Sequence, residues 1–127
     1  WVGTSKWDGI EEEGVYYTVD YNADSYENSL KSSLLSLYRE KHGEDAVPPE
    51  NTALGFDAYV IALKAIHDAK DPDDGALIAQ IITQIYGLPC ATGTITMDGN
   101  GDPIKPITVK QIKDSVPVTV YSVTPVK

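Results

Sequence analysis

The sequence has 127 residues, of which 42% are hydrophobic, and this size and composition are typical of one soluble globular domain. Its 19 acidic residues exceed its 10 basic residues, so the formal net charge is −9 at pH 7. Because an acidic surface repels phosphate groups, the composition argues against a nucleic-acid partner. No apolar run approaches the roughly 18 residues that a transmembrane helix needs. The chain starts at Trp1 rather than at methionine, so we expect it to be processed, excised or part of a longer product.

The N-terminal part is predicted to contain a loop, a strand and a helix. Residues 1–14 carry three glycines and an acidic run, which is typical of a loop. A strand is predicted over 15–20. Leucine and tyrosine side chains then recur at helical spacing, which predicts a helix over 25–42 that Asp24 or Ser25 caps.

Two further helices are predicted over 51–70 and 75–86, because apolar residues recur on one face of each. The longer one is so widely apolar that we expect it to pack between two partners. Lys31 lies off the apolar stripe of the first helix, and Asp57 is expected on a face of the second that can meet water. The buried stripe of the third helix is predicted to be Leu77, Ile78, Ile81, Ile82 and Ile85.

The last third alternates polar and apolar residues, which is typical of half-buried strands. The predicted strands are 94–97, 104–112 and 117–123. The segment 98–102 between the first two reads Asp-Gly-Asn-Gly-Asp, and these residues favour a tight turn. It resembles the beginning of a calcium loop, but Pro103 and Val109 stand where such a loop needs glycine and glutamate. A plain hairpin turn is therefore predicted.

The sequence offers no catalytic, metal-binding or cofactor-binding residues. Cys90 is the only cysteine, so it cannot form an internal disulfide, and a buried inert thiol is expected. His42 and His67 have no cysteine or second histidine at ligand spacing. No nucleophile motif of the Gly-x-Ser-x-Gly type occurs. These observations predict a protein that is not an enzyme.

The order of elements indicates an α/β fold with about three helices and a C-terminal β-hairpin. However, three apolar helices come before almost any strand that they could cover. Most of the sheet that these helices need is therefore expected to lie outside this chain.

Three segments carry a resemblance to one family. Residues 3–9 read Gly-Thr-Ser-Lys-Trp-Asp-Gly, residues 53–59 read Ala-Leu-Gly-Phe-Asp-Ala-Tyr, and residues 92–102 read Thr-Gly-Thr-Ile-Thr-Met-Asp-Gly-Asn-Gly-Asp. They resemble the acidic loop, the Gly-Tyr-Asp-Ala helix and the Thr-Gly-x-Ile-x-Phe-Asp hairpin of the type I periplasmic solute-binding proteins. This group includes the branched-chain amino-acid receptors of ABC importers. Phe56 replaces the tyrosine of the helix motif, and Met97 replaces the phenylalanine of the hairpin.

The resemblance implies that the chain is the C-terminal third of a protein with two Rossmann-like lobes joined by crossing segments. Residues 1–14 would end the second lobe, and 15–20 would be a crossing strand. Residues 21–92 would form the helical part of the first lobe, and 93–127 would cross back and close in a hairpin. Because the strands under the helices would be absent, the isolated fragment is expected to self-associate.

The resemblance also implies a ligand site in the cleft between the lobes. Ser5 matches the acidic residue that meets the ligand's α-ammonium group in the branched-chain receptors. A serine hydroxyl cannot replace a carboxylate opposite a cation, so either the ligand lacks that cation or another residue supplies the carboxylate. Trp7 offers an apolar face for the floor of a cleft or for ordinary packing. Asn51 matches a cleft-lining position, and it could equally cap its helix.

The function implied by the resemblance is that of an extracytoplasmic solute-binding component of an ABC importer, periplasmic or anchored as a lipoprotein. It would bind a branched-chain amino acid or a related amide without chemistry and deliver it to a membrane permease. The alternative is a ligand-binding sensor domain of a signalling receptor, which has the same fold. A third possibility is a fragment with no activity of its own.

Overall fold

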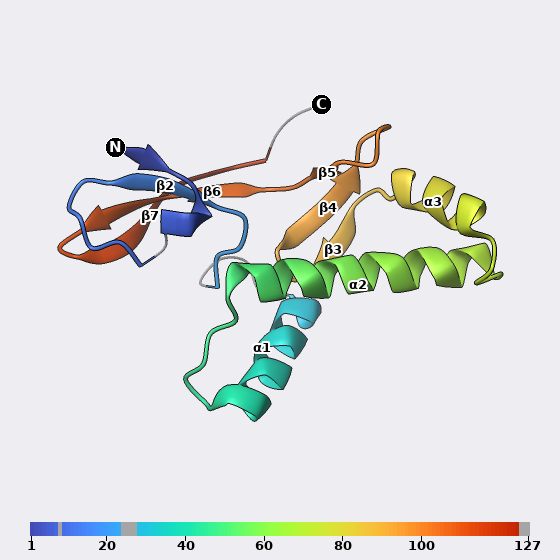
Figure 1. Ribbon diagram of the computed structural model, residues 1–127, viewed down its shortest axis with the longest axis horizontal. Helices are drawn as coiled ribbons and strands as arrows, with labels where there is room; N and C mark the ends of the chain where they lie inside the picture. The colour runs from blue at the N-terminus through green and yellow to red at the C-terminus, as the bar shows by residue number, and fades with distance from the viewer. Residues whose placement is uncertain (8, 24–27, 125–127) are drawn as a thin grey trace.

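The computed structural model describes residues 1–7, 9–23 and 28–124, which divide into two groups of elements (Figure 1). The first group is a four-stranded sheet with the strand order β1-β2-β6-β7. Its elements are β1 (Val2–Gly3), the 3-10 helix η1 (Ser5–Trp7), β2 (Tyr16–Val19), β6 (Ile107–Lys113) and β7 (Val116–Val123). The second group combines the helices with a three-stranded sheet in the order β3-β4-β5. Its elements are α1 (Ser29–His42), α2 (Glu50–Ala69), α3 (Gly75–Thr83), β3 (Leu88–Cys90), β4 (Gly93–Met97) and β5 (Pro103–Ile104).

The four-stranded sheet is mixed, with β1 parallel to β2 and the pairs β2–β6 and β6–β7 antiparallel. Alternate residues of β2 are buried on one face, as a strand with one core-facing side requires. Tyr17 and Val19 of β2 belong to a buried core that also contains Val15 and Ile112. Half-buried Trp7 packs against this core. Lys110 pairs with Tyr17 and Thr119 on neighbouring strands, so these three residues lie on the same face of the sheet.

A two-residue turn at Asp114 and Ser115 joins β6 to β7. Both residues have positive φ, 52° and 60°, which defines a type I′ turn in a hairpin closed by Lys113 and Val116. This turn matches the twist of the strands that it connects. The last predicted strand is thus confirmed, one residue longer at its start than the sequence pattern indicated.

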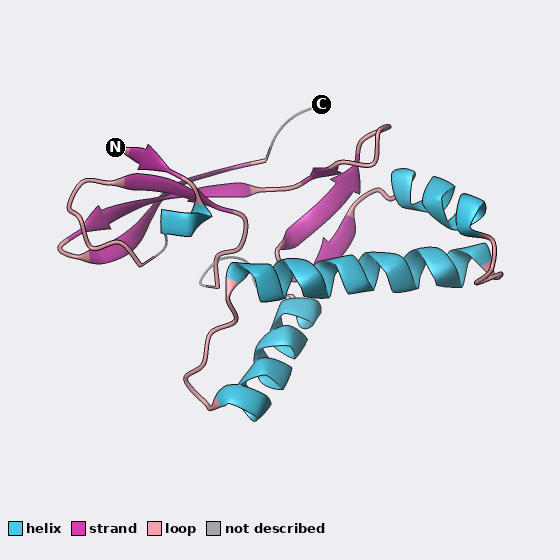
Figure 2. Cartoon of the chain, viewed as in Figure 1, coloured by secondary structure: helices cyan, strands magenta, loops and turns pink. Residues whose placement is uncertain are grey.

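The second group is organised around α2, the longest helix (Figure 2). The helix α3 lies beside the C-terminal half of α2, and β3 and β4 lie along α2 nearer its middle. Two buried clusters hold this arrangement together. One contains Tyr21, Leu34, Ala53 and Ala91, and the other contains Ile85, Cys90, Ile95 and Met97.

The three helices occur where the sequence pattern predicts them, with differences at their ends. Asn28 caps α1 by accepting a hydrogen bond from the Lys31 amide at 2.8 Å, whereas the predicted caps at 24 and 25 lie outside the described residues. Pro49 occupies the N-cap position of α2, so Asn51 lies inside the first turn and is not the cap. The helix α3 ends at Thr83, three residues earlier than predicted.

The predicted stripe of α3 is less buried than expected. None of the residues within α3 is fully buried, and Ile85, which is buried, lies after the end of the helix. The sequence pattern also missed β3, because no strand was predicted between the third helix and the strand 94–97. Leu88, Pro89 and Cys90 instead pair antiparallel with β4.

Lys31 is the clearest departure from the helical pattern. Its side chain is only 1% exposed, and its Nζ donates a hydrogen bond to the Asn22 carbonyl at 3.1 Å. The ammonium group also lies 5.9 Å from the centre of the Tyr21 ring, within the range of a cation–π contact. The expectation that this residue lies away from the packed surface was therefore wrong.

The helix α2 packs against two sets of neighbours in the described chain. Ala53 and Phe56 pack in the cluster that contains Leu34 of α1, and Val60 and Ile61 pack against the cluster formed by Ile85 and the strands β3 and β4. The expectation of two partners is thus met, although side chains such as Tyr59 and Leu63 remain exposed. Among the described residues, no helix has the length and apolar character to cross a membrane.

A small residue fills a fully buried position on α2. Ala65 has no exposed surface, so we expect Ala65→Leu to overpack the contact and to lower the free energy of unfolding by roughly 1–3 kcal/mol. Urea denaturation of both forms measures the change. Ala58→Leu is the matched control, because Ala58 is exposed on the same helix. Equal midpoints for Ala65→Leu and the unchanged chain would contradict this packing.

Candidate functional site

The two groups of elements meet at the segments that connect them, which follow β2 and precede β6 (Figure 1). Lys105 ties these segments together. Its Nζ lies 3.5 Å from the Asp20 Oδ1 and donates hydrogen bonds to the Asp20 carbonyl at 3.3 Å and to the Thr92 Oγ1 at 3.4 Å. The Lys105 side chain is only 10% exposed, whereas that of Asp20 is 45% exposed. Lys105 therefore fixes both connecting segments to each other and to the turn between β3 and β4.

Asp57 of α2 holds the same turn from the opposite side. Its Oδ1 accepts a hydrogen bond from the Ala91 amide at 2.6 Å, and its Oδ2 accepts from the Thr92 amide at 3.0 Å and from the Thr92 hydroxyl at 2.6 Å. The residue is 2% exposed, so the expectation that it faces water was wrong. Its carboxylate satisfies two backbone donors that would otherwise be buried without acceptors.

This contact explains why two of the three family-like motifs occur together. The helix segment 53–59 supplies the carboxylate, and the hairpin segment that begins at Thr92 supplies the donors. Gly93 follows at φ 136°, where a side chain is strained, and a Cβ there would lie 3.1 Å from Pro106. The Thr-Gly pair is thus required by the turn, independent of any ligand.

Removing the Asp57 carboxylate is expected to destabilise the fold severely. In Asp57→Ala the donors of Ala91 and Thr92 lose their acceptor, and each unsatisfied buried group costs roughly 1–3 kcal/mol. We therefore expect a loss of about 3 kcal/mol or more, read from the denaturation midpoint. Asp68→Ala is the control, since Asp68 is an exposed carboxylate on the same helix that pairs only with Lys64 among the described residues. A loss of similar size in both variants would contradict the assigned role.

A small cavity of about 100 Å³ lies at the junction of the two groups; we call it the junction cavity. Its walls come from β2 and the segment after it, from the start of α2 and from β6. The lining residues are Val19, Tyr21, Ala23, Val47, Pro48, Pro49, Glu50 and Lys110. Most of these are apolar, and the two charged side chains have opposite sign.

The three residues predicted to bind ligand lie in different elements of the structure. Ser5 lies in η1, and its side chain is outside what the structure describes. Trp7 is half-buried against the core of the four-stranded sheet, and its ring covers Gly3 so closely that a Cβ there would lie 2.2 Å away. Asn51 is exposed in the first turn of α2, next to Glu50, which lines the junction cavity. The structure thus gives Trp7 a packing role, and Asn51 is an exposed residue that does not line the junction cavity.

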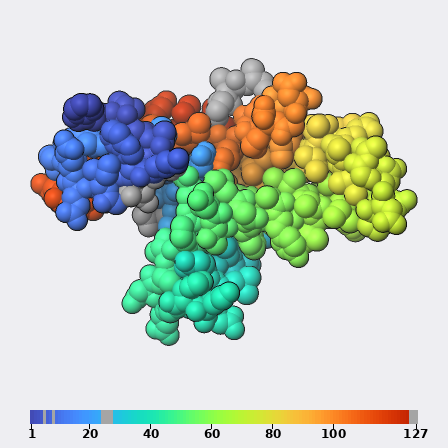
Figure 3. Space-filling view, in the orientation of Figure 1, coloured from blue at the N-terminus to red at the C-terminus, as the bar shows by residue number. Residues whose placement is uncertain are grey.

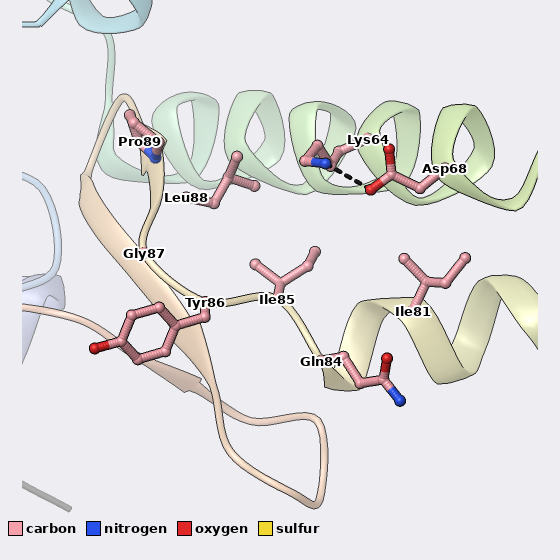
Figure 4. Close-up of a pocket in the computed structure, with 9 residues that line it drawn as sticks. All are labelled: Lys64, Asp68, Ile81, Gln84, Ile85, Tyr86, Gly87, Leu88 and Pro89. Carbon is pink, nitrogen blue, oxygen red and sulfur yellow. Dashed lines mark hydrogen bonds and ion pairs between the residues drawn. The ribbon is translucent and has the colours of Figure 1, made fainter.

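A larger groove of about 620 Å³ runs between the C-terminal half of α2 and the segment after α3 (Figure 4). Figure 4 shows the Lys64–Asp68 ion pair on one wall, with Ile81, Ile85 and Leu88 between the two helices and β3. Tyr86 points away from α2 and is 87% exposed. The charged groups of this groove are already paired with each other, so it offers no free charge for a ligand.

The acidic turn is a hairpin turn, as predicted. The Asp98 Oδ1 accepts hydrogen bonds from the amides of Asn100 at 2.8 Å and Asp102 at 2.9 Å. These backbone hydrogen bonds, first that of Asp102 and then that of Asn100, hold the pKa of the Asp98 carboxyl below its usual value. No cluster of three potential metal-ligating side chains occurs in the described part of the chain.

Cys90 is fully buried, as expected. Burial raises the pKa of its thiol to about 12, and the nearby carboxylate of Asp57 adds to this effect. A thiol in this state is protonated at neutral pH and is not a nucleophile. A buried, protonated thiol is what the sequence analysis expected at this position.

The geometry of the chain matches solved structures of solute-binding proteins. The leucine-binding protein LivK from Thermotoga maritima is 32% identical, with a TM-score of 0.76 over 89% of this chain and 31% of that protein. The substrate-binding protein LivJ from Streptococcus pneumoniae, solved with isoleucine, is 16% identical, with a TM-score of 0.73 over 98% and 37% of the two chains. An ABC-transporter solute-binding protein from R. palustris, solved with benzoate, is 15% identical, with a TM-score of 0.67 over 95% and 33%.

No protein-family model matches the sequence, and a comparison with curated proteins gives no match. The class of protein is therefore assigned from the similarity of the fold to solved structures. The chain has the α/β fold of a segment of a type I periplasmic solute-binding protein, and it resembles those of the branched-chain amino-acid ABC importers. It spans about a third of the length of these proteins.

Proposed function

We propose that the chain is part of an extracytoplasmic solute-binding protein of an ABC importer and that it has no enzymatic activity. The likeness to LivK, at 32% identity over 89% of the chain, carries this proposal. We assign the four-stranded sheet to the second lobe and the helices with β3, β4 and β5 to the first. This proposal differs from the division that the sequence motifs imply, in which 15–20 cross between the lobes and 93–127 cross back and close in a hairpin. The crossing segments are proposed to be those around Asp20 and Lys105. In such a protein the ligand bridges the lobes, and hinge closure creates the form that a permease recognises.

The proposed ligand is a small amphipathic molecule, a branched-chain amino acid or a related amide. The observation in favour is the junction itself, where apolar walls and a few charged groups converge between the two groups of elements. Ser5, Trp7 and Asn51 are the residues of this chain that we propose to lie at the ligand site. A sensor domain of a signalling receptor remains the second candidate, because it would bind ligand with the same fold.

Calorimetric titration of the complete polypeptide that contains this chain tests the ligand class. We expect binding of leucine, isoleucine, valine or their amides, with benzoate and glucose as comparison ligands. Binding of one of these amino acids or amides, with no hydrolysis or other conversion of the ligand, supports the proposal. Tight binding of glucose with no response to any amino acid or amide would contradict it.

We also propose that the chain on its own self-associates. The space-filling view shows separate projections rather than one compact body (Figure 3). Apolar side chains remain exposed on both groups, including Tyr59 and Leu63 on α2 and Val118 and Tyr121 on β7. Exposed faces of this kind are commonly covered by another chain or by the rest of the protein.

Light scattering of the isolated chain over a wide concentration range tests this self-association. We expect a mass that rises with concentration, because the apolar surfaces gain from mutual burial. The complete polypeptide is the control, and its mass should not rise in the same way. A monomer of constant mass in the isolated chain would contradict the proposal.

A further inference from the structure

Asn100 and Gly101 form the only Asn-Gly pair of the chain, and they lie in the acidic turn between β4 and β5. Asn100 is exposed and Gly101 is half-buried. Glycine has no Cβ, so its amide nitrogen is unhindered toward the side chain of the preceding residue. An Asn-Gly pair in an open chain is therefore reactive, because the glycine nitrogen can attack the side-chain carbonyl of the asparagine.

This reaction is an intramolecular displacement that removes the side-chain amide. The Gly101 nitrogen gives up its proton to a base in the solvent and forms a bond to the Asn100 Cγ. The bond between Cγ and Nδ2 breaks, Nδ2 takes up a proton and leaves as ammonia, and a five-membered succinimide remains. Water then adds to one of the two ring carbonyls and opens the ring. The product is aspartate or isoaspartate, and in both a carboxylate replaces the amide.

The attacking nitrogen is occupied in the folded turn. The Gly101 amide donates a hydrogen bond to the Asp98 carbonyl at 3.2 Å, so this contact must break before the nitrogen can be deprotonated. The Asp98 carboxylate opposes the same step, because a negative charge nearby disfavours the formation of a second anion. Both effects slow the reaction while the turn is closed.

Asp98 also holds Asn100 itself. The Asp98 Oδ1 accepts the Asn100 amide at 2.8 Å, and the Asn100 Nδ2 lies 3.5 Å from the Asp98 Oδ2. On the other side of Gly101, the Asp102 amide donates to the same Oδ1 at 2.9 Å, and the Asp98 amide donates to the Asp102 carbonyl at 2.9 Å. Asp98 thus fixes the turn on both sides of the bond between Asn100 and Gly101.

We propose that Asn100 is a site of spontaneous deamidation and that Asp98 sets its rate by keeping the turn closed. The reaction proceeds from the fraction of molecules in which the turn is open, so its rate follows that fraction. The product places a carboxylate beside Asp98 where the Asn100 amide stands, and an attractive contact becomes a repulsive one. This modification site is independent of the proposed ligand.

Incubation of the complete polypeptide that contains this chain, at physiological temperature and mildly alkaline pH, measures the rate. Proteolysis and tandem mass spectrometry locate the mass gain that accompanies conversion of the Asn100 amide to a carboxylate. Isomerisation at Asp98 and Gly99 leaves the mass unchanged, so the mass gain reports on Asn100. The same polypeptide in guanidinium chloride gives the rate of the open chain. We expect it to exceed the folded rate roughly tenfold or more, since each hydrogen bond of the turn is worth a factor of about two to ten.

Two substitutions at position 98 and one at position 102 test the role of Asp98. Asp98→Ala removes the acceptor of two backbone amides, and it should raise the folded rate roughly tenfold. Asp98→Ser should give an intermediate rate, because a serine hydroxyl accepts such hydrogen bonds more weakly. Asp102→Ala is the matched control. It removes one negative charge from the same turn, its side chain makes no hydrogen bond or ion pair among the described residues, and the rate should stay within about twofold.

Asn28 provides an internal reference for unfolding of the whole protein. It caps α1, far from the turn in sequence, and its side chain is held by the Lys31 amide. Opening of the turn alone leaves the rate at Asn28 unchanged, whereas global unfolding brings it to the value measured in guanidinium chloride. If Asp98→Ala unfolds by this criterion, Asp98→Ser carries the test and must react faster than the wild type with Asn28 unaffected.

Four results would overturn the inference. Absence of conversion at position 100 in guanidinium chloride would show that Asn100 is not a deamidation site. Equal rates for the folded and the unfolded wild type would show that the turn gives no protection. An unchanged rate in folded Asp98→Ala would remove Asp98 from control of the reaction. An equal rise in Asp102→Ala and Asp98→Ala would assign the effect to the charge of the turn and not to the hydrogen bonds of Asp98.

Discussion

The carboxylate of Asp57 is the constraint on which the second group of elements depends. The turn between β3 and β4 carries the amides of Ala91 and Thr92 into a buried position, where the acceptor of both is a side chain of α2. Asp57 accepts both amides and the Thr92 hydroxyl from one point on α2. The long helix, the turn and the hairpin after it are thereby held at fixed positions, and the two apolar clusters can pack around them. A neutral side chain could fill the space, but it would not accept three hydrogen bonds.

A series of polar contacts links Asp57 to the two segments that connect the groups of elements. The Thr92 hydroxyl donates to Asp57 and accepts from Lys105, and Lys105 in turn lies against the carbonyl and the carboxylate of Asp20. Each buried charge in this chain of contacts meets an opposite charge or a hydrogen-bonding dipole, as burial requires. The two segments that join the groups are thus tied by directional polar contacts rather than by apolar packing. Such contacts have defined geometry, so they can specify how one group is positioned on the other.

The sequence predicted the order of helices and strands well, because apolar spacing reports directly on which face is buried. It failed where a polar residue is buried. Asp57 and Lys31 were expected away from the packed surface, yet both are almost fully buried, because their partners are backbone groups distant in sequence that no local pattern reveals. Only the resemblance of residues 53–59 to a family motif indicated that Asp57 has a specific role. For the site, spacing and resemblance singled out Ser5, Trp7 and Asn51, whereas Glu50 and Lys110 come together only through the meeting of α2 and β6. Their separation of 60 residues leaves no signal in the sequence alone.

Asp20 links the structural contacts to the junction cavity. Its carbonyl and carboxylate face Lys105, while its amide donates to the Glu50 carboxylate that lines the cavity. Asp20 is therefore held from two sides, by Glu50 at the start of α2 and by Lys105 before β6. A movement of the segment after β2 relative to α2 must break or lengthen the hydrogen bond between the Asp20 amide and Glu50, whereas the contacts with Lys105 keep the two connecting segments together. The position of one group of elements on the other thus depends on a few directional polar contacts around a single residue.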